Sequence, residues 1–248
     1  RQRNDERGTV MKQTHLITAA ALLALSPLVQ AVDKHEPAFS RVIVDEFEAR
    51  DADEGTVAAW EAAAWYGGDL NKLYLSTEGE RLMDNGGETE GFETRVAWNR
   101  AFAPFWDWQL GARRDWQPDD PNRDWASFGV QGLAPYLFES EATLFVGEEG
   151  LTNLRLEAEY EILFTQKLIL VPAVEANFYG KEDEELGIGE GLTDIEAGLR
   201  LRYEIRREFA PYIGVNWERQ FGDTAAKTRG AGDDVSETTL VAGVRFWF

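Results

Sequence analysis

Carboxylate side chains carry the clearest chemistry in this sequence, because they are numerous and recur at every second position. The 248-residue chain holds 45 Asp and Glu residues against 25 Lys and Arg. Between Arg155 and Glu161, charged side chains occupy positions 155, 157, 159 and 161. Residues two apart in a β-strand share a face, so we expect Glu157, Glu159 and Glu161 to project together. Such oxygen ligands suit hard cations such as Ca²⁺, Mg²⁺ and Mn²⁺.

Soft metal ligands and catalytic groups are scarce. The chain has no cysteine, and beyond residue 31 it holds one histidine, His35, and one methionine, Met83. Thiolate metal sites and disulfides are therefore excluded. A hydrolase would need a nucleophile beside a base, and the sequence contains no Gly-x-Ser-x-Gly motif. We expect a non-enzymatic protein in which His35 and Met83 are outlying candidate metal ligands.

The elements that must position the carboxylates are β-strands. In residues 195–205 every odd position is apolar, and every even position except Gly198 is charged. This alternation has the period of a strand with one apolar face. About twelve such segments, bounded by turn residues, lie near 41–50, 55–66, 72–79, 91–101, 105–116, 124–134, 137–147, 152–164, 167–179, 192–205, 210–221 and 237–248.

The aromatic end of the last segment indicates a membrane. Residues 240–248, Leu-Val-Ala-Gly-Val-Arg-Phe-Trp-Phe, end on Phe248 with further aromatic residues beside it. Aromatic girdles at strand ends are typical of outer-membrane barrels. No stretch is long enough for a transmembrane helix. Apart from helices, only closed barrels satisfy every backbone hydrogen bond within lipid. The sequence predicts an all-β fold, a transmembrane antiparallel β-barrel of about twelve strands over residues 41–248, surrounded by outer-membrane lipid.

The first forty residues predict export. Met11 and Lys12, the apolar run 16–28 and a small residue at Ala31 have the order of a secretory signal. We therefore expect a signal peptide over residues 11–31 and a short periplasmic segment over 32–40, and exclude residues 1–10 as upstream sequence. The expected location is the outer membrane of a Gram-negative cell.

Connections alternate between short turns and longer acidic loops, as in a barrel with both ends on one side. The short turns are expected at 67–71, 102–104, 134–136, 165–166 and 206–209, and the longer loops at 78–91, 117–124, 180–191 and 222–237. Pro172 falls inside one strand, where a bulge or a locally unpaired position would accommodate it.

A polar inward face remains when the apolar residues are assigned to lipid. Two interpretations stay open: an interlocked ion-pair core, or an excess of acid that recruits a cation. The chain's net charge of −20 favours cations and argues against nucleic acid as a partner. The predicted cation cluster comprises Glu157, Glu159, Glu161, Glu196, Glu204 and Glu218, with Asp107 and Glu175 as further candidate ligands.

Several long blocks resemble the copper-resistance protein B family of Gram-negative outer membranes. The resemblance covers residues 42–248, and its blocks include 60–73, Pro104-Phe105-Trp106-Asp107, Gly129-Val130-Gln131-Gly132-Leu133-Ala134-Pro135-Tyr136, 178–181 and 198–212. It implies an outer-membrane barrel that sequesters or exports copper ions with a periplasmic multicopper oxidase.

One segment departs from the family pattern. Members commonly carry a Met- and His-rich stretch before the barrel, and here residues 32–37 hold a single histidine. If copper passes through, the acids of the barrel must handle it, and oxygen ligands favour Cu(II) over Cu(I). The alternative is a general small-solute or structural outer-membrane barrel without a specific metal role.

Overall fold

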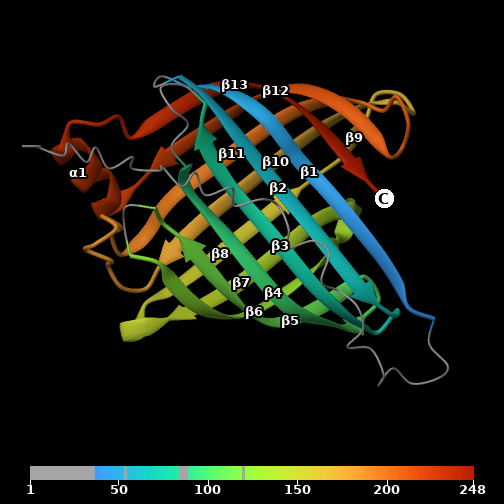
Figure 1. The fold of residues 1–248 in the computed structure, drawn as a ribbon, viewed down its shortest axis with the longest axis horizontal. Coiled ribbons are helices and arrows are strands. Elements are labelled where there is room, and N and C mark those ends of the chain that lie inside the picture. Colours follow the sequence, from blue (N-terminus) through green and yellow to red (C-terminus); the bar gives the residue numbers. More distant parts are fainter. Residues whose placement is uncertain (1–36, 53–54, 84–88, 119–120) are drawn as a thin grey trace, which may run out of the picture. The chain divides into compact units, whose positions relative to one another are not determined.

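The computed structural model describes residues 37–52, 55–83, 89–118 and 121–248. They form an antiparallel β-sheet that closes on itself, with tilted strands (Figure 1). The strands are β1 (Phe39–Ala52), β2 (Gly55–Gly67), β3 (Asn71–Leu82), β4 (Thr89–Ala103), β5 (Trp106–Trp116), β6 (Arg123–Ala134), β7 (Phe138–Gly147), β8 (Thr152–Glu159), β9 (Ile162–Leu163), β10 (Leu168–Tyr179), β11 (Gly191–Tyr203), β12 (Phe209–Gln220) and β13 (Ser236–Trp247).

Twelve strands make up the wall of the barrel. The sheet order runs from β11 through β12, β13 and β1 to β8 and β10, and β10 also pairs with β11, which closes the sheet. β8 and the two-residue β9 count as one wall strand, because both pair with β10 in a single register: Glu159 faces Ala173 and Ile162 faces Leu170. The predicted twelve-stranded closed barrel is confirmed.

Pro172 explains the break between β8 and β9. The Tyr160 N–H donates to the Pro172 carbonyl oxygen at 3.0 Å. Proline has no N–H to return the second bond of the pair. Because the register is the same on both sides of the break, Pro172 is a locally unpaired position and does not create a bulge.

The seam of the barrel joins the last strand to the first. Val42 and Phe248 exchange two backbone hydrogen bonds of 2.9 Å each, beyond the end of β13. Phe248 itself is exposed, as are large apolar residues along the outer wall such as Leu240 and Ile213. Their exposure is what a lipid-facing surface requires.

Short turns lie at one end of the barrel as predicted, but the predicted loop 78–91 is shorter, because β3 extends to Leu82 and β4 begins at Thr89. One end of the barrel, the short-turn end, has the turns 68–70, 104–105, 164–167 and 204–208 and the 3₁₀ helix η1 (Pro135–Leu137). At the opposite, long-loop end lie 180–190, the 3₁₀ helix η2 (Glu148–Gly150) and 221–235. Exposed aromatic residues at the short-turn end, as a girdle requires, include Phe102, Phe105, Tyr136, Phe164, Tyr203, Phe209 and Phe248.

One long loop contains a helix that the sequence did not predict. Helix α1 (Gly222–Ala231) has no apolar stripe, so it gives no helical periodicity to detect. It packs instead through single contacts: the Thr224 Oγ1 accepts a hydrogen bond from the Gly189 N–H at 2.8 Å. Gly232, with φ +100°, ends it in the left-handed conformation. Among the described residues, no helix has the length and apolar character to cross a membrane.

Candidate cation-binding lumen

Acidic side chains on neighbouring strands lie directly opposite one another inside the barrel. The first acidic row crosses β1 to β5, and the second crosses β7, β8, β10, β11 and β12. Like charges placed directly opposite destabilise a sheet, so each row needs compensation. The first row is Glu46, Glu61, Glu78, Glu93 and Asp115, and the second is Glu141, Glu157, Glu175, Glu196 and Glu218.

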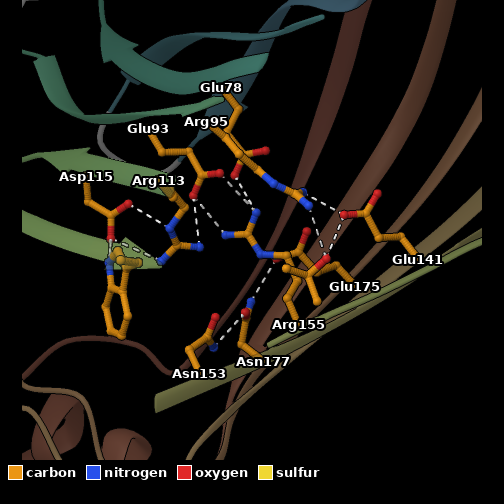
Figure 2. Close-up of polar contacts among 12 residues, drawn as sticks. Glu78, Glu93, Arg95, Arg113, Asp115, Glu141, Asn153, Arg155, Glu175 and Asn177 are labelled. Carbon is orange, nitrogen blue, oxygen red and sulfur yellow. Dashed lines mark hydrogen bonds and ion pairs between the residues drawn. The ribbon is translucent and has the colours of Figure 1, made fainter. Parts of the chain in front are cut away.

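Arg155 compensates members of both rows. Its guanidinium lies 2.9 Å from Glu78, 3.0 Å from Glu93 and 3.2 Å from Glu175. Figure 2 shows this guanidinium between carboxylates that come from three different strands. The contact joins residues up to 77 positions apart, so it exists only because the sheet closes.

Two further arginines complete an arginine layer around one aromatic ring. Arg113 lies 3.2 Å from Glu93, and Arg95 lies 2.6 Å from Glu141. The guanidinium groups of Arg95, Arg113 and Arg155 stand 5.7, 4.1 and 5.7 Å from the centre of the fully buried Phe145 ring. Here the lumen is an ion-pair core, the first of the two interpretations.

A second ion-pair group surrounds Glu48, which is only 4% exposed. Its carboxylate accepts hydrogen bonds from Arg50 at 2.8 Å, from Arg200 at 3.0 Å and from the Tyr212 hydroxyl at 2.9 Å. Arg50 and Arg200 also pair with Glu46, at 3.4 and 2.7 Å. A buried carboxylate with this many donors is held in one position.

Between these groups lies a cavity of about 890 Å³, the lumen cavity. Four glutamates on its wall have no partner: in the described part of the chain, no cationic nitrogen lies within 4.0 Å of them and no side chain hydrogen-bonds to them. Carboxylates that face a confined space without a counter-charge attract cations. The four are Glu61, Glu139, Glu157 and Glu159.

The structure brings part of the predicted cation cluster together. Glu157 and Glu159 line the lumen cavity without a counter-charge. Glu161 and Glu196 line it too, but Glu161 pairs with Arg202 and Glu196 lies 3.5 Å from Arg50.

The other predicted carboxylates are paired or lie outside the lumen cavity. Asp107 and Glu175 both line this cavity, but Asp107 pairs with Lys72 at 3.3 Å and Glu175 with Arg155 at 3.2 Å. Glu218 lines a different cavity at the long-loop end. Glu204 follows the last residue of β11 and lies in the turn 204–208, not on a strand face as predicted, because β11 ends at Tyr203.

The two soft ligands are remote from this cavity. Met83 is exposed just after β3, at the long-loop end, and His35 lies outside the described residues. Within residues 37–248, as far as they are described, no three His, Cys, Asp or Glu side chains are grouped closely enough to hold a metal ion.

Glu46, Glu48, Glu61 and Glu78 are lumen residues that the sequence analysis missed. β1 has a bulge, because Val44 pairs with Ala62 while Glu46 pairs with Glu61. The inward face therefore changes from odd to even positions at Asp45, and both Asp45 and Glu46 line the cavity. Two consecutive acids in an otherwise alternating strand were the signal of this change.

Comparison with known proteins gives one family. The model of the family "Copper resistance protein B precursor" matches residues 38–248. Copper resistance protein B of Escherichia coli is 41% identical over 256 residues, covering 98% of this chain and 85% of that protein. The homologue from Pseudomonas syringae pv. tomato is 46% identical over 209 residues, covering 84% of this chain and 70% of that protein.

Solved structures with a similar fold are porins. The KdgM porin aligns with a TM-score of 0.50 at 12% identity, and the NanC porin with a TM-score of 0.51 at 9% identity. Each alignment covers 84% of this chain and 99% of the porin. At these identities the likeness is one of fold.

Proposed function

Because the chain belongs to the copper resistance protein B family, we propose that this outer-membrane barrel sequesters or exports copper together with a periplasmic multicopper oxidase. Copper is here the cargo. We further propose that residues 11–31 direct export, that 32–40 form a short periplasmic segment and that 41–248 form the barrel domain.

One observation carries the proposal: glutamates without a counter-charge face the lumen cavity. Glu157 and Glu159 stand two positions apart on β8, on one face, and Glu139 pairs with Glu159 across β7 and β8. Together with Glu61 they give the cavity a surplus of negative charge. Carboxylate oxygens accept Cu(II) more readily than Cu(I), so an oxidase is a fitting partner.

The test is the double substitution Glu157→Gln with Glu159→Gln. If these carboxylates hold the cargo, the purified barrel loses Cu(II) affinity while its thermal stability does not fall. Neither residue takes part in an ion pair, and removing charges that lie opposite other glutamates relieves repulsion. The matched control is Glu148→Gln with Glu149→Gln, which removes the same charge from exposed positions in η2. The control should keep Cu(II) affinity.

A copper-sensitivity assay extends the test to cells. A deletion strain should regain copper tolerance with the wild-type gene and with the control, but not with the lumen double variant. Earlier melting with intact Cu(II) affinity would assign Glu157 and Glu159 to a structural core. Absence of saturable Cu(II) binding by the wild-type barrel would favour the general small-solute or structural barrel.

A further inference from the structure

A second cavity, the helix-side cavity, lies at the long-loop end between α1 and the ends of β11 and β12. It measures about 370 Å³ and is lined by Asp194, Glu218 and Thr224 among others. On the same two strands, the lumen cavity is lined by Glu196 and Asn216. Residues two apart share a face of a strand, so the two cavities border neighbouring positions on one inward face, and we call this boundary the junction of the two cavities.

The junction of the two cavities carries two opposed carboxylates. Glu196 and Glu218 pair directly across β11 and β12, which places their Cβ atoms about 4.5–5.5 Å apart. In the described part of the chain, Glu218 has no cationic nitrogen within 4.0 Å. Glu196 has Arg50 at 3.5 Å, but that guanidinium lies closer to Glu48, at 2.8 Å. The pair therefore keeps a surplus of negative charge.

Asn216 adds an independent sign of a missing ligand. This residue is 4% exposed, and its Nδ2 donates a hydrogen bond of 2.8 Å to Glu196. The carboxylate can only accept, so the orientation of the amide is fixed: Nδ2 donates to Glu196, and Oδ1 is left for another partner. That Oδ1 is buried without a hydrogen-bond partner. Leaving such a group unsatisfied costs about 1–3 kcal/mol, so it calls for an explanation.

The residue opposite Asn216 repeats the pattern. Thr239 on β13 pairs directly with Asn216, and its Oγ1 is also buried without a partner. Two buried neutral oxygens, on paired residues of β12 and β13, thus lack hydrogen-bond partners next to the Glu196–Glu218 pair. Cations such as Ca²⁺, Mg²⁺ and Mn²⁺ are bound by this combination of carboxylate, amide and hydroxyl oxygens.

We propose that Glu196, Glu218 and Asn216 form a weak divalent-cation site at the junction of the two cavities, through which cations pass between the lumen and the long-loop end along β11 and β12. The inference deepens the proposed function and rests on it for a cationic cargo. Two carboxylates give a dissociation constant on the order of 0.1–1 mM. Weak binding suits transit, because a passing ion must also leave.

The route has a physical reason to follow this wall. The arginine layer is built on β4, β5 and β8, where three guanidinium groups and their carboxylate partners occupy the lumen as an ion-pair core. Neither β11 nor β12 contributes to that layer. A cation moving from the lumen cavity toward α1 along β11 and β12 passes Glu196, Glu218 and Asp194, whereas the arginine layer offers only carboxylates that are already paired. Lys227 of α1 also lines the helix-side cavity, and it pairs with Glu182 at 3.3 Å.

Mn²⁺ alone is the probe, titrated into the purified full-length barrel and followed by electron paramagnetic resonance. We expect saturable binding that Glu218→Gln weakens by about tenfold or more, since it removes one of two charged ligands. Asn216→Asp should strengthen binding by about tenfold, because it supplies a third carboxylate at the same position. If Asn216 had only a structural role, Asn216→Asp would not strengthen Mn²⁺ binding.

Asn153→Asp is the matched control. Asn153 is 1% exposed and also has an unpartnered Oδ1, but it lines neither cavity. Its substitution should leave Mn²⁺ affinity unchanged. If Asn216→Asp lowers the melting temperature and gains no Mn²⁺ affinity, or if Glu218→Gln binds Mn²⁺ as the wild type does, the proposal is overturned. Because Glu218 is exposed, its variant tests the site even where Asn216→Asp fails to assemble.

The two proposals fail separately. Unchanged Mn²⁺ binding in Glu218→Gln, with loss of Cu(II) affinity in the Glu157 and Glu159 double variant, removes only the junction site. Weakened Mn²⁺ binding in Glu218→Gln, with Cu(II) affinity intact in the double variant, keeps the junction site and removes the proposed role of the other two glutamates.

Discussion

Substituting Arg155 by methionine should destabilise the barrel strongly, because one guanidinium serves carboxylates on three strands. Its nitrogens lie 2.9, 3.0 and 3.2 Å from Glu78, Glu93 and Glu175, and its side chain is 13% exposed. Methionine keeps much of the length but removes the charge, and with it the guanidinium that lies 5.7 Å from the centre of the Phe145 ring. Removing one partner of a buried ion pair costs about 3–5 kcal/mol, since the other charge remains buried.

The matched control is Arg114→Met on the same strand as Arg113. Arg114 pairs with Asp124 at 3.5 Å, and the two side chains are 43% and 59% exposed. Exposed pairs contribute about 0–1 kcal/mol. The two variants thus remove the same group from a buried and from an exposed pair, and the difference between them isolates the effect of burial.

Urea unfolding of the folded barrel in lipid vesicles measures both variants. We expect Arg155→Met to lower the free energy of unfolding by about 3–5 kcal/mol. Adding Glu78→Gln to Arg155→Met should recover part of the lost free energy of unfolding, because it removes a carboxylate that the first substitution leaves unpaired. A loss below about 1 kcal/mol for Arg155→Met, equal to the control, would refute the arginine layer as a stabilising core.

Three other predictions concern the seam, a loop and the wall. Deleting Arg245–Phe248 removes three of the seven residue pairs of the seam, those of Trp247, Phe246 and Phe248. It should abolish the heat-modifiable band in outer-membrane fractions; normal levels would contradict this. The hydrogen bonds from Arg123, at 2.8 and 2.9 Å, hold the pKa of Asp183 below its ordinary value. The loop 180–190 should therefore stay paired with Arg123 above the ordinary carboxyl pKa and become sensitive to pepsin as the pH falls through the lowered pKa. Asp183→Asn should be sensitive already at the upper end of that range, and equal cleavage of both proteins at every pH would count against the Arg123–Asp183 pair as the attachment of this loop. A Cβ on Gly111 would lie 2.2 Å from a backbone oxygen, whereas a Cβ on Gly230 would meet no other side chain or strand within 4 Å. Gly111→Ala should therefore cost about 1–3 kcal/mol in urea unfolding, and Gly230→Ala should cost none.

The wall of the barrel could be predicted from the sequence because lipid imposes a strict alternation. Residues 192–205 were expected as a strand, and β11 runs from Gly191 to Tyr203. The same rule failed locally at Asp45, where a bulge shifts the alternation by one residue. It also gave no indication of α1, whose ten residues have no apolar face.

The candidate site was harder to predict than the wall. Alternation shows that Glu157 and Glu159 face inward, but it does not show which arginine reaches which acid. Arg155 meets Glu78 only through the closed sheet, across 77 positions of sequence. Two further placements depend on the register between strands, which the sequence does not show. Glu218 lies opposite Glu196, and Glu161 pairs with Arg202.

The seam also sets the order in which the barrel folds. Asp45 and Arg245 are in contact at 2.7 Å across it, although they are 200 positions apart. Contacts of high sequence separation form late, because the entropy of closing a long chain must be overcome first. Consecutive strands can pair earlier as hairpins, which leaves β1 and β13 as the two open edges of a nearly complete sheet. Open edges pair readily with other chains, so efficient assembly requires that both edges stay covered until they meet in the membrane.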